Sequence, residues 1–417
     1  MVISVIGLGY IGLPTAAILG SKGFNIIGVD NNRNVVEIIN KGKVHIVEPG
    51  LEEMVHKAVI KGNLHASSSP KKADIFIIAV PTPFKINHNP DLSYIELAIR
   101  NIAPVIQEGN LIILESTVPV GTTEKLKKWL KAERPDLYFP NEEKDIGAEY
   151  INIAHCPERV LPGNIINELI ENNRIIGGIS TKCANRAKNF YKLFVKGDCI
   201  ITDSRTAELS KLVENSFRDV NIAFANELSL IADKLDIDVW ELIQLANLHP
   251  RVNILQPGPG VGGHCIAVDP WFIVDSAPEE SNLIRQARLV NDKKPEFICK
   301  KIKQAAERTK INKSELVIAS LGLAFKPNID DLRGSPAMQI AKNIELMGFK
   351  AHYICEPNIT LLPDIFNSKQ TQLVNFNRAL TESDILVLLV DHEEFKQIDL
   401  KLIKSKEVID TRGIWSK

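Results

Sequence analysis

The chain has 417 residues, with 50 basic and 51 acidic side chains, a formal net charge of −1 and hydrophobic residues at 45% of its positions. This length exceeds a single compact core and indicates two or three domains, while the balanced charge gives no general attraction to nucleic acid. No signal peptide, bilayer-spanning apolar stretch or Cys-x-x-Cys pair among the six cysteines is apparent, which predicts a cytoplasmic protein without structural zinc or disulfides.

The first segment alternates short apolar runs with amphipathic stretches. Strands are predicted at residues 2–6, 26–29, 75–80 and 111–114. This alternation is typical of βαβ units around a parallel sheet. Because ligands bind beyond the carboxyl ends of such strands, the residues placed there become candidates for ligand contact. They are Gly7, Asp30, Thr82 and Thr117.

The first strand is followed by Gly7-Leu8-Gly9-Tyr10-Ile11-Gly12, a G-x-G-x-x-G pattern that opens a predicted helix. Gly7 permits a tight turn, Gly9 lets the backbone approach a pyrophosphate, and Gly12 lets helix and strand pack closely. Asp30 follows Gly12 by 18 positions, where a ribose-binding carboxylate belongs. We expect NAD, since a carboxylate repels a 2′-phosphate, although Arg33 leaves NADP open, FAD is the main rival, and a structural turn is the alternative.

A long helix is predicted at residues 206–235, where apolar residues recur at helical spacing without Gly or Pro, and further helices at 239–248 and 281–309. Lys211, Asn215 and Arg218 share one face of the long helix. In a cleft, a lysine beside an asparagine can hold an alkoxide or a water. A solvated helix face is the alternative interpretation.

A loop rich in Gly and Pro then contains Gly258-Pro259-Gly260-Val261-Gly262-Gly263-His264-Cys265. Its four glycines would let backbone N–H groups crowd a ligand next to Cys265, which makes this thiol a candidate nucleophile. A buried structural cysteine is the alternative. Arg251, before the loop, could contact a phosphate or a sugar hydroxyl.

Pro157-Glu158-Arg159 follows a predicted strand at 151–155 and would place a carboxylate and a guanidinium at the cleft, with a surface salt bridge as the alternative. The α/β pattern then restarts near residues 312–314. Strands are predicted at 316–321, 351–354, 385–389 and 408–409, with a helix at 337–347. No metal site is expected, because His392-Glu393-Glu394 lacks the second histidine of H-E-x-x-H: position 396 is Lys.

In this order the motifs resemble the UDP-glucose/GDP-mannose dehydrogenase family over nearly the whole chain. The resemblance is carried by residues 7–12, 80–83, 115–117, 157–159, 211–215, 258–269, 325–326 and Arg333. Within the family, stretches 215–221, 249–270 and 326–333 are most similar to the branch that acts on UDP-N-acetyl-D-mannosamine. UDP-glucose enzymes typically have Ser before the cysteine and Lys before the aspartate. His264 and Val268 stand there instead, which argues against glucose.

The resemblance implies an α/β fold of two Rossmann-like parallel-sheet domains joined by a central helical domain with a long helix. It implies an NAD-binding domain at 1–198, a helical dimerisation domain with the cysteine loop at 199–311, and a UDP-binding domain at 312–417. A cytoplasmic homodimer in surface polysaccharide synthesis is expected, without nucleic-acid or membrane partners.

The resemblance also implies a four-electron oxidation at C6 of the sugar with NAD, through an aldehyde, a thiohemiacetal and a thioester on Cys265, then hydrolysis to the uronate. Lys211 is the implied acid/base or oxyanion-stabilising group, helped by Asn215 and a water. Asp269 would support this network, and Glu158 is a candidate for activating the hydrolytic water.

The remaining roles follow from the same resemblance. The implied NAD contacts are Gly7, Gly9, Tyr10, Ile11, Gly12, Asp30, Thr82 and Thr117. The implied UDP-sugar contacts are Arg159, Val160, Lys211, Asn215, Arg218, His249, Arg251, Gly262, Phe325, Lys326 and Arg333. In this family Arg251 would reach the site of the partner subunit.

Three alternatives stay open. A two-electron dehydrogenase or epimerase-type enzyme would stop at the aldehyde or keto level and would not need Cys265. A non-catalytic sensor would bind NAD and UDP-sugar without turnover. UDP-N-acetylglucosamine and, less favoured, UDP-N-acetylgalactosamine are alternative substrates, because pocket shape decides sugar stereochemistry.

Overall fold

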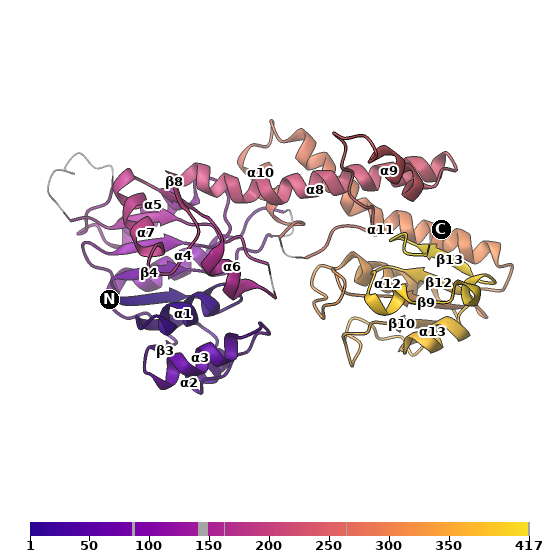
Figure 1. The fold of residues 1–417 in the computed structure, drawn as a ribbon, viewed down its shortest axis with the longest axis horizontal. Helices are drawn as coiled ribbons and strands as arrows, with labels where there is room; N and C mark the ends of the chain where they lie inside the picture. The colour runs from indigo at the N-terminus through magenta and orange to yellow at the C-terminus, as the bar shows by residue number, and fades with distance from the viewer. Residues whose placement is uncertain (86–87, 141–148, 162, 264, 416–417) are drawn as a thin grey trace. The chain divides into compact units, whose positions relative to one another are not determined.

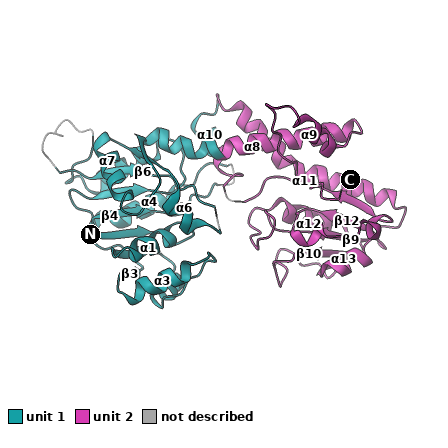
Figure 2. Cartoon of the chain, in the orientation of Figure 1, with its two compact units in different colours: residues 1–214, 271–278 teal, residues 215–270, 279–417 magenta. Residues whose placement is uncertain are grey.

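The computed structural model describes residues 1–417 except 86–87, 141–148, 162, 264 and 416–417. The chain divides into two compact units (Figure 2). The first unit comprises Met1–Glu214 and Trp271–Pro278, and the second comprises Asn215–Pro270 and Glu279–Lys417. Helices α8 (Ser204–Lys234) and α10 (Asp269–Ser276) contribute residues to both units.

The first unit is built on an eight-stranded sheet with the order β3-β2-β1-β4-β5-β6-β7-β8 (Figure 1). Its strands are β1 (Val2–Ile6), β2 (Asn25–Val29), β3 (Leu64–Ser67), β4 (Ile75–Ile78), β5 (Leu111–Leu114), β6 (Asn152–His155), β7 (Arg174–Gly178) and β8 (Cys199–Asp203). The pairs are parallel except β6 with β7, which is antiparallel. Chain order reverses at β1, the point where open α/β sheets bind their ligands.

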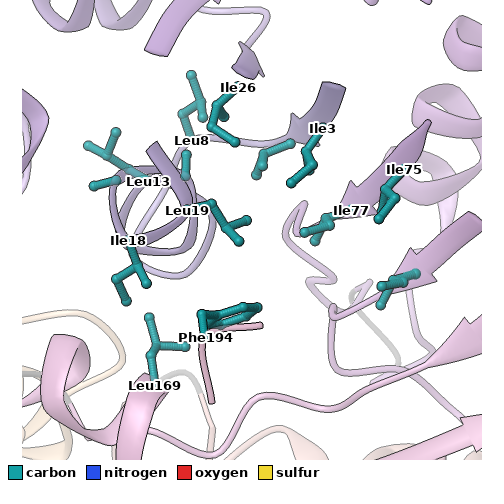
Figure 3. Close-up of a cluster of buried hydrophobic side chains, with 14 of the residues drawn as sticks. Ile3, Leu8, Leu13, Ile18, Leu19, Ile26, Ile75, Ile77, Leu169 and Phe194 are labelled. Atoms are coloured by element: carbon teal, nitrogen blue, oxygen red, sulfur yellow. The ribbon is translucent and has the colours of Figure 1, made fainter. Parts of the chain in front are cut away.

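Helices separate these strands along the chain, except β3 and β4, which follow each other without one. The helices are α1 (Gly12–Ser21), α2 (Arg33–Asn40), α3 (Leu51–Ile60), α4 (Ser93–Ile102), α5 (Thr122–Glu133), α6 (Ile165–Glu171) and α7 (Thr181–Tyr191), with a 3-10 turn at Ala103–Val105. β4 and β5 are apolar and buried throughout, as expected for strands covered on both faces. Figure 3 shows how Leu13, Ile18 and Leu19 of α1 join a buried cluster with Ile3 and Ile77 of the sheet. This packing fixes α1 and the turn that precedes it.

The second unit contains a five-stranded parallel sheet with the order β11-β10-β9-β12-β13. Its strands are β9 (Val317–Leu321), β10 (Ala351–Cys355), β11 (Thr371–Leu373), β12 (Ile385–Leu388) and β13 (Glu407–Asp410). Its other helices are α9 (Val239–Ala246), α11 (Asn282–Arg308), α12 (Pro336–Met347), α13 (Phe376–Glu382) and α14 (Glu393–Lys396), with a 3-10 turn at Leu400–Ile403.

The predicted architecture of two Rossmann-like sheets with a long helix between them in sequence is confirmed. Among the named strands of the described residues, the one departure from parallel pairing is β7, whose antiparallel contact with β6 the sequence pattern does not reveal. Within the described part of the chain, no helix has both the length and the apolarity needed to cross a membrane.

Candidate active site

The turn after β1 has the geometry of a dinucleotide-binding turn. Gly7 adopts a φ of 91°, a conformation that favours glycine, and its N–H donates to the Val29 carbonyl at 2.8 Å. The next N–H, of Leu8, donates to Oδ2 of Asp30 at 3.0 Å. The turn therefore brings the carboxylate at the end of β2 beside the start of α1.

The glycines of this turn meet three different surroundings. A Cβ on Gly7 would lie 2.7 Å from the Ala79 carbonyl oxygen, and one on Gly12 would lie 1.8 Å from the Gly7 carbonyl oxygen. A Cβ on Gly9 would meet nothing within 4 Å. Gly7 and Gly12 are thus required by packing, whereas Gly9 faces open space beside the N-terminus of α1, where a pyrophosphate would bind backbone N–H groups. These residues fit NAD.

The other predicted cofactor residues border the same edge of the sheet. Tyr10 is exposed and Ile11 half-buried at the start of α1. Thr82 and Thr117 follow β4 and β5, and the Thr82 hydroxyl donates to the Thr117 carbonyl at 2.6 Å. The two loops are therefore joined to each other beside the nucleotide turn.

In the Pro-Glu-Arg segment after β6, the glutamate is buried, whereas the arginine forms a partly exposed salt bridge. Glu158 is only 8% exposed, and its carboxylate accepts the Arg159 N–H at 2.7 Å and a guanidinium N–H of Arg174. Arg159 donates to Glu214 at 2.8 Å, and Val160 is half-buried. Arg174, at the start of β7, thus holds the Glu158 carboxylate in place through a buried ion pair.

A second buried carboxyl lies in the same cluster. Glu115 follows β5 and accepts a 2.6 Å hydrogen bond from the Tyr191 hydroxyl. Burial raises the pKa of Glu115 to about 7, although the positive charge of Arg174 opposes the shift. Burial also raises the pKa of the neighbouring Cys156 thiol to about 12, which makes Cys156 an inert structural cysteine.

The glycine loop of the second unit is held by close backbone contacts. Gly260 and Gly263 have φ values of 145° and 83°. A Cβ on Gly262 would lie 2.7 Å from the Gly334 carbonyl oxygen, and one on Gly263 would lie 3.0 Å from the Phe325 ring. The loop therefore packs against two of the predicted UDP-sugar segments, at Phe325 and next to Arg333.

Cys265 stands at the end of this loop and is the exposed cysteine, whereas the other five are buried. Its carbonyl oxygen accepts the Val268 and Asp269 N–H groups at 3.0 and 2.9 Å, which leads the chain into α10. Asp269 is buried and accepts a 2.5 Å hydrogen bond from the Asn215 side chain. The structure therefore brings Asn215 and Asp269 together, with the backbone of Cys265 one turn away from Asp269.

The remaining predicted residues are distributed over both units. Glu158, Arg159, Val160 and half-buried Lys211 belong to the first unit. Five exposed side chains belong to the second: Arg218, His249, Arg251, Lys326 and Arg333. Arg333 is held by Asp331 at 2.7 Å, and His264 lies outside the described residues.

Some residues of these sites carry no motif in the sequence. Glu208, one helical turn before Lys211, accepts the Gly121 and Thr123 N–H groups at 2.6 and 2.7 Å and so fixes the start of α8 to the first unit. Arg412 donates to Asp391 at 2.8 Å, and its guanidinium would lie 2.6 Å from a Cβ on Gly258. The position of Arg412, just after the strand β13, is the sequence signal that could have indicated it as a site residue.

Family models match the chain in three consecutive parts. These are the NAD binding domain of the UDP-glucose/GDP-mannose dehydrogenase family at residues 1–195, its central domain at 205–293 and its UDP binding domain at 319–417. The chain belongs to the UDP-glucose/GDP-mannose dehydrogenase family. It is an NAD-dependent oxidoreductase that acts on a UDP-sugar.

Individual relatives are similar over almost their whole length. An NDP-N-acetyl-D-galactosaminuronic acid dehydrogenase from Ralstonia nicotianae is 57% identical over 99% of this chain and 96% of its own. A UDP-N-acetyl-D-mannosamine dehydrogenase from Escherichia coli is 56% identical over 99% of both. The solved UDP-D-ManNAc dehydrogenase from Pyrococcus horikoshii is 41% identical, with a TM-score of 0.87 over 99% of this chain and 96% of its own.

Proposed function

We propose that this NAD-dependent enzyme oxidises C6 of UDP-N-acetyl-D-mannosamine to the carboxylate, with Cys265 as covalent nucleophile. The observation that carries the proposal is the exposed Cys265 at the end of a tightly packed glycine loop, followed by the hydrogen-bonded pair Asn215 and Asp269. The assignment of the substrate is supported by relatives named for UDP-N-acetyl-D-mannosamine, which are similar over nearly their whole length.

The chemistry balances as two oxidations of two electrons each. When bound, NAD would supply the hydride acceptor, one molecule for each oxidation, so each sugar would yield two NADH. In the first, the C6 alcohol loses a hydride and a proton to become an aldehyde. The Cys265 sulfur then adds to the aldehyde carbon, and loss of a second hydride and a proton leaves a thioester. Water cleaves the thioester, releasing the carboxylate and the thiol. The sulfur keeps the aldehyde from escaping between the two steps.

The polar residues around this chemistry have proposed roles. Lys211 serves as the proton acceptor for the alcohol and the donor to the oxyanion, and Asn215 holds a water beside it. Asp269 orients Asn215 through their hydrogen bond. Glu158 faces the hydrolytic water, and Arg174 fixes its carboxylate.

The test is an NADH count for each sugar with the purified protein. We expect two NADH and one uronate per UDP-N-acetyl-D-mannosamine, and no uronate from Cys265→Ala. One NADH per sugar would indicate the two-electron alternative, and tight binding without NADH would indicate a sensor. Uronate formation by Cys265→Ala at the wild-type rate would refute the covalent mechanism.

A UDP-N-acetylgalactosamine substrate is the second candidate. The relative from Ralstonia nicotianae, named for N-acetyl-D-galactosaminuronic acid, matches as well as those named for the mannosamine sugar. Rates with UDP-N-acetylmannosamine, UDP-N-acetylglucosamine, UDP-N-acetylgalactosamine and UDP-glucose decide the substrate. The largest kcat/KM with a sugar other than the first would overturn our assignment.

We also propose that α8 mediates a homodimer. Phe217, Phe224 and Ile231 recur every seven residues on this helix, and they are 71%, 53% and 48% exposed. A repeated apolar face of this kind is typical of a helix that packs against another protein surface. In sedimentation experiments we expect a dimer that Phe217→Asp with Phe224→Asp dissociates, while Leu361→Asp, at an exposed leucine in the C-terminal part, does not. A monomeric wild type would refute this proposal.

A further inference from the structure

The glycine loop begins with a hydrogen bond to a buried side chain far away in the sequence. The N–H of Gly258 donates to Oδ1 of Asn226 on α8 at 2.9 Å. Asn226 is completely buried, and Gly258 is also buried. A buried N–H without an acceptor costs free energy, so this bond ties the first glycine of the loop to α8.

The orientation of Asn226 is set by a second asparagine on α11. Nδ2 of Asn226 donates to Oδ1 of Asn291 at 2.8 Å. Nδ2 of Asn291 in turn donates to Oδ1 of Asp219 at 2.8 Å, and Arg288 donates to the same oxygen at 2.6 Å. These four residues are at most 1% exposed.

This chain of hydrogen bonds can run in one direction only. The Arg288 guanidinium can only donate and the Asp219 carboxylate can only accept, so Asn291 must offer its NH2 group to Asp219. Its oxygen then faces Asn226, which must donate to it and keeps its own oxygen for the Gly258 N–H. The ion pair between α8 and α11 thereby determines which atom meets the loop.

The backbone of Asn291 also lies near the loop. A Cβ on Gly260 would lie 3.4 Å from the Asn291 carbonyl oxygen and 2.9 Å from Pro336. The Asn226 side chain, oriented by Asn291, therefore restrains the loop at Gly258, before it reaches Cys265. Displacement of a reacting group by about 1 Å can cost a hundredfold in rate.

We propose that Asn226 and Asn291 are positioning residues for the Cys265 thiol, acting through Gly258. The inference rests on the proposed function, in which Cys265 is the nucleophile. Neither asparagine touches the substrate in this scheme, so their loss should change the geometry and reactivity of the thiol rather than the affinity for UDP-sugar or NAD.

The test combines alkylation of Cys265 with steady-state kinetics in the full-length protein. Iodoacetamide should modify native protein at Cys265, since the other cysteines are buried, and Cys265→Ala supplies the background rate. For Asn226→Ala and Asn291→Ala we expect the alkylation rate to change at least about fivefold and kcat to fall about tenfold or more, with both KM values within about threefold. The double variant should lose little more than either single variant, because the two residues act in one chain.

Ser229→Ala is the matched control. Ser229 also joins α8 to α11, through a partly buried hydrogen bond from Lys294, and its hydroxyl donates to the backbone carbonyl of Asn226 rather than to the side-chain amide that meets the loop. We expect this variant to keep the wild-type alkylation rate and kcat. If Asn226→Ala does not fold, Asn226→Asp keeps the size and an acceptor for Gly258 but cannot donate to Asn291, and the same changes are expected.

Wild-type alkylation rate and kcat in the folded asparagine variants would overturn the inference, as would equal changes in Ser229→Ala. The alkylation rate requires no turnover, so it tests the positioning of the thiol independently of the reaction. Uronate formation by Cys265→Ala would instead refute the proposed function. The alkylation rates would still show whether the two asparagines position the thiol.

Discussion

Two alanine substitutions in the nucleotide turn separate cofactor binding from stability. A Cβ at position 9 meets nothing within 4 Å, and Gly9 does not have a positive φ. Gly9→Ala should therefore leave the folded protein intact, and restriction of the unfolded chain could add about 0.4–1 kcal/mol of stability. The methyl group would occupy the space that a pyrophosphate needs, so we expect the Kd for NADH to rise at least tenfold, about 1.4 kcal/mol.

Gly12→Ala places the same methyl group 1.8 Å from the Gly7 carbonyl oxygen. No ordinary contact is so short, so α1 must move away from the turn, and overpacking of this kind costs about 1–3 kcal/mol or more. Gly12→Ala should lose both stability and NADH binding. Thermal melting and fluorescence titration with NADH measure the two effects. Wild-type affinity in Gly9→Ala, or equal stability of the two variants, would refute the reasoning.

Three buried carboxylates give further predictions. Arg174→Met leaves the buried Glu158 carboxylate without its cation and should lower the free energy of unfolding in denaturant by about 3–5 kcal/mol. Adding Glu158→Leu should restore part of this stability, and no recovery would contradict the pairing. Burial raises the pKa of Glu115 from 4.5 to about 7, so its stabilising effect is full below pH 4.5 and is lost as pH rises through 7. The free energy of unfolding of Glu115→Gln relative to wild type should therefore rise by at most about 3 kcal/mol between pH 5 and 8. Parallel pH profiles of stability for the two proteins would contradict this. Burial favours a higher pKa for Glu356, but hydrogen bonds from His392 and backbone N–H groups lower it from 4.5 to about 2. Wild type should thus be more stable to unfolding than Glu356→Gln above pH 4.5, and this difference should disappear toward pH 2. A difference in stability that does not change with pH would contradict this.

Much of the fold follows from local sequence patterns. The predicted strand at 316–321 and helices at 206–235 and 337–347 differ from β9, α8 and α12 by one or two residues at their ends. Each of these elements has a clear apolar period or run. β3 and β11 lacked such a signal, because they are short and carry polar residues such as His65 and Gln372. Their pairing with longer parallel neighbours defines them.

The candidate site divides in the same way. The glycines of the nucleotide turn and Asp30 could be found because strand, turn and helix fix their spacing along the chain. Glu158 is held by Arg174, 16 residues away, and Asn226 by Asn291, 65 residues away. A charged or amide side chain in a helix or strand ordinarily indicates an exposed face, so sequence patterns give no reason to place these partners inside.

The first strand of each sheet is followed by the same turn. Gly7 after β1 and Gly322 after β9 have φ values of 91° and 93°. Each donates its N–H to the last residue of the neighbouring strand, to Val29 and to Cys355, at 2.8 Å. In each, the following residue donates to an acid at the end of that strand.

The two acids have different surroundings. Asp30 is half-buried and accepts the N–H of Leu8 at 3.0 Å. Glu356 is 3% exposed and accepts the N–H of Leu323 at 2.7 Å and a bond from Nε2 of His392 at 3.0 Å. Asp30 thus remains partly exposed, whereas the carboxylate of Glu356 is enclosed by protein.

In the second sheet, His392 connects the enclosed acid to a neighbouring loop. Its Nδ1 accepts the N–H of Asn328 at 2.9 Å, so Nε2 must carry the proton that bonds to Glu356. Asn328 follows directly after Phe325-Lys326-Pro327, the segment expected to contact the UDP-sugar. The enclosed acid therefore anchors this loop through its histidine, so the same backbone turn holds a half-buried acid in the first sheet and an enclosed acid in the second.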